Sequence, residues 1–179
     1  MTAGLLARGA SDSEREDAFA GLIDRSLPTS YRLAAVLLGS ESEAQDAVQD
    51  AAITAWERFD SLRDPERFEA WFQRILANRC RDRLRRRRRV PFVAMDGAGA
   101  AVLSDGDRGI AEREALAGAL AELSPDHRLV IVLRFYADLS LEQISARTGE
   151  RLGTVKSRLH YGLEALRAAY DAGSREGSR

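Results

Sequence analysis

The sequence LSLEQISARTGERLGTVKSRLHYGLEAL, residues 139–166, predicts two short helices joined by a tight turn. Leu141, Ile144 and Thr148 recur at helical spacing, and Gly149 is the residue type that most readily ends a helix in the left-handed conformation. Thr154 is the expected N-cap of the second helix. The expected buried stripe of that helix consists of Val155, Leu159, Leu163 and Leu166.

The opposite face of the second helix carries polar side chains near its N-terminus. They are Lys156, Ser157, His160 and Tyr161, and Lys156 is the only lysine in the chain. A helix-turn-helix places such a face in the major groove of DNA. The pattern therefore predicts a DNA-reading helix, with an ordinary antiparallel helix pair as the alternative.

Composition favours an all-α protein of one or two small domains. Of the 179 residues only 7% are aromatic, and alternating runs of Val and Ile are nearly absent. The single cysteine, Cys80, excludes an internal disulfide and a zinc site built from cysteines. No apolar run approaches the ~20 residues that span a bilayer, and the N-terminus lacks a signal-peptide core. We therefore expect a cytoplasmic protein with no membrane insertion.

The net charge of −1 hides a strong segregation of charge along the chain. Residues 1–70 hold 7 Arg and 14 acidic residues, whereas residues 71–92 hold 9 Arg and one Asp. Residues 93–179 hold 11 basic and 13 acidic residues. A protein that binds only nucleic acid is usually basic overall. This distribution suits a protein that touches DNA locally and presents an acidic surface to a basic protein partner.

The first domain is predicted to be a four-helix unit over residues 14–89. Its expected helices cover residues 14–27, 30–38, 42–60 and 66–89. Pro28 is expected to end the first, Gly39 the second, and Ser42 to open the third. Pro65 lies in the short loop before the fourth.

Residues 90–109 contain Pro91 and four glycines and predict a flexible linker. The second domain, residues 110–170, begins with a helix over 110–123. Ser124 and Pro125 then form an N-cap and first helical residue, and the next helix covers 126–136. Its inward residues are expected to be Leu129, Val130, Leu133 and Phe135. The tail, residues 171–179, is expected to be disordered.

A basic run, RCRDRLRRRRR, has eight arginines among residues 79–89. Arginines at this density neutralise phosphates and bind DNA in a salt-dependent manner. The run continues the helix that bears Trp71 and Phe72, so it favours a surface that holds a separated strand. The alternatives are that at least one of these aromatic residues belongs to the core and that the arginines form a solvated helix end.

Catalysis finds little support in the sequence. Periodicity brings together no Ser, His and Asp group, no glycine-rich phosphate loop and no cluster of metal ligands, and His127 lies far from His160. We therefore expect no enzymatic activity, no catalytic residue, no metal and no cofactor.

Two segments, in this order, resemble a bacterial RNA polymerase sigma factor of the extracytoplasmic-function (ECF) type in the sigma-70 family. EAQDAVQDAAITAWERFDSLRDPERFEAWFQRILANRCRDRLRR (residues 43–86) looks like sigma region 2. LAELSPDHRLVIVLRFYADLSLEQISARTGERLGTVKSRLHYGLEALR (residues 120–167) looks like sigma region 4, in which the GTVKSRL core is specific. The resemblance implies a factor that binds core RNA polymerase and recognises the −10 and −35 promoter elements.

The resemblance also implies roles for individual residues. In region 4, the −35 element would be read in the major groove by Lys156, Ser157 and His160, with supporting contacts from Arg134, Arg151 and Arg158. In region 2, a pocket for a flipped −10 base would involve Leu62, Arg63, Asp64 and Asn78, with the neighbouring backbone held by Arg81, Arg83 and Arg85. The clamp of core polymerase would be gripped by Asp46, Gln49 and Asp50.

The implied partners are the clamp region of core polymerase, promoter DNA as duplex and as melted non-template strand, and an anti-sigma factor. The chain departs from the family where many members have an Arg-Ala pair after the recognition-helix histidine, because it has Tyr161 and Gly162. A close approach to another helix is a possible reason for this glycine. Two further interpretations are a stand-alone helix-turn-helix regulator and a helical adaptor whose arginines bind RNA.

Overall fold

The computed structural model describes residues 12–88 and 109–176, and within these ranges the chain is helical with no strand. The first unit comprises α1 (Asp12–Leu38), α2 (Glu41–Glu57), the 3-10 turns η1 (Phe59–Ser61) and η2 (Pro65–Arg67), and α3 (Phe68–Arg87). The second comprises α5 (Ile110–Glu122), α6 (Pro125–Phe135), α7 (Leu141–Thr148) and α8 (Leu152–Glu176). The all-α prediction is confirmed. The predicted linker lies, except for Gly109, outside the described residues.

One continuous helix, α1, replaces the first two predicted helices, so the first unit has three α-helices rather than four. Pro28 lies inside α1 and does not end it. A proline in a helix leaves the carbonyl four residues earlier without its donor, here that of Asp24. Both residues are exposed, so water can satisfy this carbonyl, while buried residues on either side, such as Ile23 and Leu33, hold the helix in place.

The start of α2 also differs from the prediction. Ser40, not Ser42, is the N-cap, and its hydroxyl accepts a hydrogen bond from the Glu43 backbone N–H at 3.4 Å. Gly39 adopts the left-handed conformation at φ 69° and reverses the chain after α1. Because α1 ends at this glycine and α2 begins two residues later, the two helices pack as an antiparallel pair.

Aromatic side chains fill one end of the first unit. The Phe19 ring lies edge-on to Trp56, Phe59 and Phe68, with centroid distances of 5.2, 5.2 and 5.8 Å. Phe72 stacks on Phe68 at 5.9 Å and has no exposed surface. Phe72 therefore belongs to the core, which confirms the alternative for one of the two aromatic residues beside the arginine run, whereas Trp71 is half-buried.

The cap at Ser124 and the helix end at Gly149 are as predicted, whereas the cap at Ser140 was not among the predictions. Ser124 caps α6 by accepting from the His127 backbone N–H at 3.2 Å, and Pro125 is the first helical residue. A capping box at Ser140 and Gln143 starts α7, and Gly149 ends it at φ 74°. The start of α8 was predicted wrongly, because the helix begins at Leu152 and Thr154 lies within its first turn.

Two predicted inward residues are exposed instead. Phe135 is 62% exposed because it is the last residue of α6, one turn beyond the buried Ile131 on the same face. Leu163 is 39% exposed because the packed stripe of α8 passes through the buried Gly162 beside it. The expected disordered tail is also wrong in part, since α8 continues through residues 171–176.

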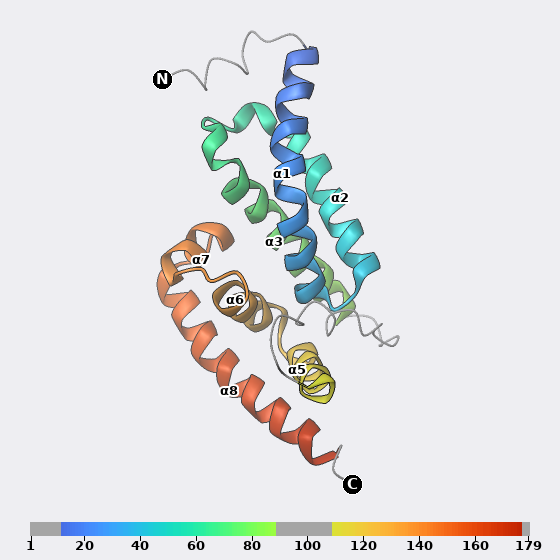
Figure 1. Cartoon of the computed structure of the whole chain (residues 1–179). Helices are drawn as coiled ribbons and strands as arrows, with labels where there is room; N and C mark the ends of the chain where they lie inside the picture. Colours follow the sequence, from blue (N-terminus) through green and yellow to red (C-terminus); the bar gives the residue numbers. More distant parts are fainter. Residues whose placement is uncertain (1–11, 89–108, 177–179) are drawn as a thin grey trace.

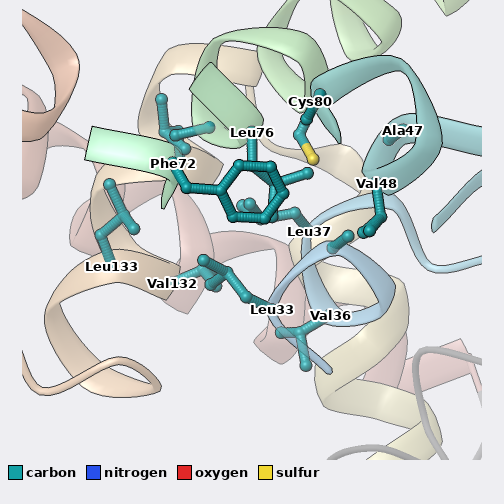
Figure 2. Close-up of a cluster of buried hydrophobic side chains, with 14 of the residues drawn as sticks. Leu33, Val36, Leu37, Ala47, Val48, Phe72, Leu76, Cys80, Val132 and Leu133 are labelled. Atoms are coloured by element: carbon teal, nitrogen blue, oxygen red, sulfur yellow. The ribbon is translucent and has the colours of Figure 1, made fainter. Parts of the chain in front are cut away.

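The two units share one hydrophobic core, and α6 joins them. Leu129, Val130, Val132 and Leu133 of α6 belong to the same buried cluster as the core residues of α1, α2 and α3. Figure 2 shows Val132 and Leu133 facing Leu33 and Phe72. In Figure 1, α6 lies between the first unit and α8. The described chain is therefore one closed body in which an apolar helix is covered on several sides.

None of the helices in the described ranges is long and apolar enough to cross a membrane.

We predict that the thiol of Cys80 is unreactive in the folded protein. Burial raises the pKa of this fully buried thiol to about 12, so almost none of it is thiolate at pH 8. Ellman's reagent at pH 8 is expected to label the native chain only as fast as it unfolds, and to label it at once in guanidinium chloride. Rapid stoichiometric labelling of the native protein would contradict this packing.

Candidate nucleic-acid interface

The N-terminal half of α8 presents an exposed polar face. Lys156, Ser157 and His160 are all exposed, while Val155 of the same turn has no exposed surface. The His160 side chain is 68% exposed, and its Nε2 lies 3.7 Å from a Glu164 carboxylate oxygen. The structure thus brings the three predicted base-reading residues together on one accessible surface.

Hydrogen bonds in the turn fix α8 relative to α7. The Ser145 hydroxyl donates to the Glu150 carbonyl at 2.6 Å, and the Glu150 N–H donates to the Thr148 hydroxyl at 3.3 Å. At the other end of α7, the pKa of Glu142 is lowered, chiefly by a backbone hydrogen bond and secondly by a hydrogen bond from the Ser140 hydroxyl. The connection between the two helices is therefore held by side-chain bonds as well as by Gly149.

Gly162 allows α8 to approach α6 closely. A Cβ placed on Gly162 would lie 3.1 Å from the Ile131 Cδ1 and 3.2 Å from the His127 Cβ. Both distances are tighter than ordinary van der Waals contact. The close approach to another helix that the sequence suggested is therefore present, and it accounts for the glycine that follows Tyr161.

The three supporting arginines of the predicted −35 surface differ in exposure and in the contacts that they form. Arg151 is exposed in the turn before α8. Arg134 donates to the Leu139 carbonyl at 3.2 Å and lies 3.6 Å from Asp138. The Arg158 side chain is only 23% exposed, because it forms ion pairs with Glu150 at 3.0 Å and with Asp126 at 3.7 Å.

All three arginines predicted to hold the −10 backbone form ion pairs with carboxylates. Arg81 pairs with Glu150 at 3.1 Å and Arg85 with Asp126 at 2.9 Å. Arg83 pairs with Asp50 at 2.6 Å, inside the first unit. In this arrangement DNA phosphates would have to displace carboxylates from each of these side chains.

The predicted −10 pocket residues lie on two segments. Asn78 is in the middle of α3, and its Oδ1 accepts a hydrogen bond from Arg81 at 2.8 Å. Leu62 packs partly against the core, and Arg63 is exposed. The Asp64 carboxylate caps η2 by accepting from the Glu66 N–H at 3.0 Å, so it has a local structural role.

The predicted polymerase-binding residues form a single face of α2. Asp46, Gln49 and Asp50 are exposed at helical spacing, with the carboxylates of Asp46 and Asp50 65% and 51% exposed. Ile53 continues this face one turn later and is 53% exposed. An exposed isoleucine among acidic residues was missed from the sequence, although its helical spacing from Gln49 and Asp50 would have revealed it.

Sequence reasoning also missed Asp126 and Glu150, the acidic partners of the arginines. Neither stands out in the sequence, because their importance arises from packing between residues far apart along the chain. Among the described residues no group of three or more His, Cys, Asp or Glu side chains is arranged to hold a metal ion.

Comparison with known families matches both halves of the chain. Residues 22–90 match the model described as Sigma-70 region 2, and residues 119–168 match Sigma-70, region 4. The two matches fall on the first unit and on α6 to α8.

Curated relatives are similar over most of their length. RNA polymerase sigma factor SigV of Bacillus subtilis is 35% identical over 137 residues, which cover 76% of this chain and 81% of SigV. ECF RNA polymerase sigma factor SigW of the same organism is 33% identical over 165 residues, covering 85% of this chain and 88% of SigW.

Solved structures are similar across both units. The sigma factor RpoE of Bartonella quintana, in complex with the anti-sigma factor NepR, matches with a TM-score of 0.65 and 27% identity, covering 86% of this chain and 96% of RpoE. A structure of CnrH in complex with the cytosolic domain of CnrY matches with a TM-score of 0.63 and 27% identity, covering 94% of this chain and 95% of the matched chain.

We predict that Gly162→Ala destabilises the protein although alanine is the better helix former. Replacing an exposed helical glycine by alanine gains about 1 kcal/mol, whereas overpacking a core contact costs about 1–3 kcal/mol. The His127 Cβ cannot yield without moving α6, so the clash should dominate. The measurement is the free energy of unfolding from urea denaturation.

Gly173→Ala is the matched control, because Gly173 lies in the same helix with open space around the added Cβ. It is expected to leave stability unchanged or to raise it slightly. If the two variants gain stability equally, α8 does not approach α6 as closely as described.

Proposed function

Because the chain belongs to the ECF sigma factors of the sigma-70 family, and is a transcription initiation factor that directs RNA polymerase to promoters, we propose how its two units divide promoter recognition. The second unit reads the −35 element and the first captures the melted −10 element. The observation that carries this proposal is the exposed polar face of α8, which follows the capped helix α7 and the left-handed turn at Gly149.

Lys156, Ser157 and His160 are the proposed base-reading residues. An ammonium, a hydroxyl and an imidazole offer donors and acceptors that match base edges in the major groove. Arg151 and Arg134 lie at the ends of neighbouring elements and are proposed to contact phosphates, which fix the position of the helix without reading sequence. Arg158 joins them once its carboxylate partners are released.

The −10 element is proposed to lie along α3 and the segment before it. Arg81 and Arg85 lie one turn apart on the face of α3 toward the second unit, whereas Arg83 faces α2. All three are proposed to contact the backbone of the non-template strand. Asn78 and the stretch from Leu62 to Asp64, including Arg63, are proposed to border the site of the flipped base. The support for this assignment is the match to region 2 together with the basic charge of α3.

Core polymerase is proposed to bind the exposed face of α2. Asp46, Gln49 and Asp50 supply acidic and amide groups, and Ile53 supplies apolar surface within the same patch. Such a combination of exposed apolar and charged groups suits a specific interface, because charge sets orientation while apolar contact adds affinity.

An anti-sigma factor is the proposed negative regulator. The similar structure of RpoE holds the anti-sigma factor NepR. The similar structure of CnrH holds the cytosolic domain of CnrY. An inhibitor of this kind would compete with core polymerase for binding to this chain.

We predict that Lys156→Ala reduces promoter-specific transcription by roughly ten-fold or more. A good contact between a side chain and a base is worth about 1–3 kcal/mol, and Lys156 is the only lysine in the chain that could form such a contact. The measurement is run-off transcription with purified core polymerase on a promoter found by selecting templates with the wild-type holoenzyme. On the same promoter with a scrambled −35 element, the substitution should reduce transcription much less.

Arg167→Ala is the matched control, since Arg167 is an exposed basic residue farther along α8. It is expected to leave the preference for the intact −35 element unchanged. Equal losses in both variants, or a wild-type chain that dimerises and binds an inverted repeat tightly without polymerase, would overturn the proposed function.

We further predict that Asp46→Asn weakens binding to core polymerase by roughly three-fold, as expected for one exposed charge at an interface. Its ion pair with Arg83 is long, at 3.6 Å, so the fold should tolerate the change. Titration of fluorescently labelled chain with core polymerase measures the effect. Asp17→Asn in α1 is the control because Asp17 is also an exposed aspartate. An identical loss in this variant would contradict an interface on α2.

A further inference from the structure

Polar contacts surround the shared core where the two units meet. The Arg147 guanidinium donates to the Gln73 side-chain oxygen, and Arg88 donates to the Glu122 carbonyl at 3.0 Å. Arg128 is only 4% exposed, and its Nη2 donates to the Val36 carbonyl at 3.1 Å. These contacts join residues that the chain separates by 34 to 92 positions.

The burial of Arg128 shows how closely the units pack. Burial, and then the nearby charge of Arg87, lower the pKa of Arg128 to about 10. A guanidinium so placed loses its hydrogen bonds to water, and the Val36 carbonyl replaces only some of them. The contact therefore depends on apolar packing for its stability, and its polar groups determine which surfaces meet.

Two carboxylates of the second unit connect both predicted DNA-binding surfaces. Glu150 lies between Arg81 of α3, at 3.1 Å, and Arg158 of α8, at 3.0 Å. Asp126 lies between Arg85 of α3, at 2.9 Å, and the same Arg158, at 3.7 Å. The five side chains thus form one chain of ion pairs that runs Arg81, Glu150, Arg158, Asp126, Arg85.

This chain of ion pairs is partly withdrawn from water. The side chains of Glu150 and Asp126 are 25% and 26% exposed, and those of Arg81 and Arg158 are 15% and 23% exposed. Arg85, at the end of this series, is 45% exposed. Shielding of the other four side chains makes their attractions stronger than those of fully exposed pairs, yet leaves them open to competition from a polyanion.

We propose that Asp126 and Glu150 act as internal substitutes for DNA phosphates and hold the free chain in a closed state with low affinity for DNA. They occupy arginines from both units at once, so the closed state and the promoter-bound state exclude each other. Arg81, Arg85 and Arg158 must exchange carboxylates for phosphates when the units separate. The inference rests on the proposed function for the identity of the DNA-binding arginines, but the closed state itself is a property of the free chain.

The test is the paired variant Asp126→Asn with Glu150→Gln in the full chain. Both changes keep side-chain size and remove the charges that neutralise the arginines. Small-angle X-ray scattering of the free protein should show a larger radius of gyration than the wild type. Fluorescence anisotropy with a labelled duplex of random sequence should show a roughly ten-fold lower Kd.

A matched control separates opening from the change in net charge. Glu114→Gln with Asp171→Asn alters the net charge by the same amount at exposed positions of α5 and α8. This control should keep the wild-type radius of gyration and lower the Kd only slightly. Circular dichroism verifies folding, and each single variant repeats the test at smaller amplitude if the pair does not fold.

The proposal is overturned if the paired variant keeps the wild-type radius of gyration, or if its gain in DNA affinity equals that of the control. Run-off transcription with core polymerase separates this outcome from failure of the proposed function. An absence of promoter-specific transcripts from the wild-type chain counts against the proposed function, while an increased radius of gyration in the variant still supports the closed state.

Discussion

The burial of α6 is the constraint on which the rest of the structure depends. Residues 128–133 of this helix are all buried, which is possible only if neighbours cover it on more than one side. Helix α8 covers one side, at the glycine contact, and the first unit covers another. Apolar surface drives this arrangement, because its removal from water is worth about 25 cal/mol for each Å². The arginine and carboxylate contacts are arranged around that apolar centre.

Much of the fold follows from local signals in the sequence. The cap at Ser124 and the left-handed Gly149 are set by short-range chemistry, so they were predicted, and the capping box at Ser140 has the same local origin although it was missed. Pro28 was misleading, because packing on both sides of an exposed proline outweighed its preference for ending a helix. Ser40 and Ser42 are both suitable caps, and only the position of Gly39 before them decides between the two.

The candidate site was predictable to a different degree. The outward face of α8 follows from helical periodicity, and the acidic face of α2 follows from its spacing together with the family resemblance. The pairing of Arg81 with Glu150 and of Arg85 with Asp126 was not predictable, because it depends on how two units pack and joins residues 69 and 41 positions apart. A dense arginine run indicates affinity for anions, but it does not say whether the anion belongs to DNA or to the same chain.

Arg158 is constrained in two ways, unlike Lys156 and His160. It contacts both carboxylates and lies beside the face that is proposed to read the promoter. A substitution there alters two properties at once, so selection on either one restricts it. Lys156 and His160 point outward and take no part in the chain of ion pairs. If these assignments hold, substitutions at Lys156 and His160 change promoter preference and leave the ion pairs of Arg158 intact.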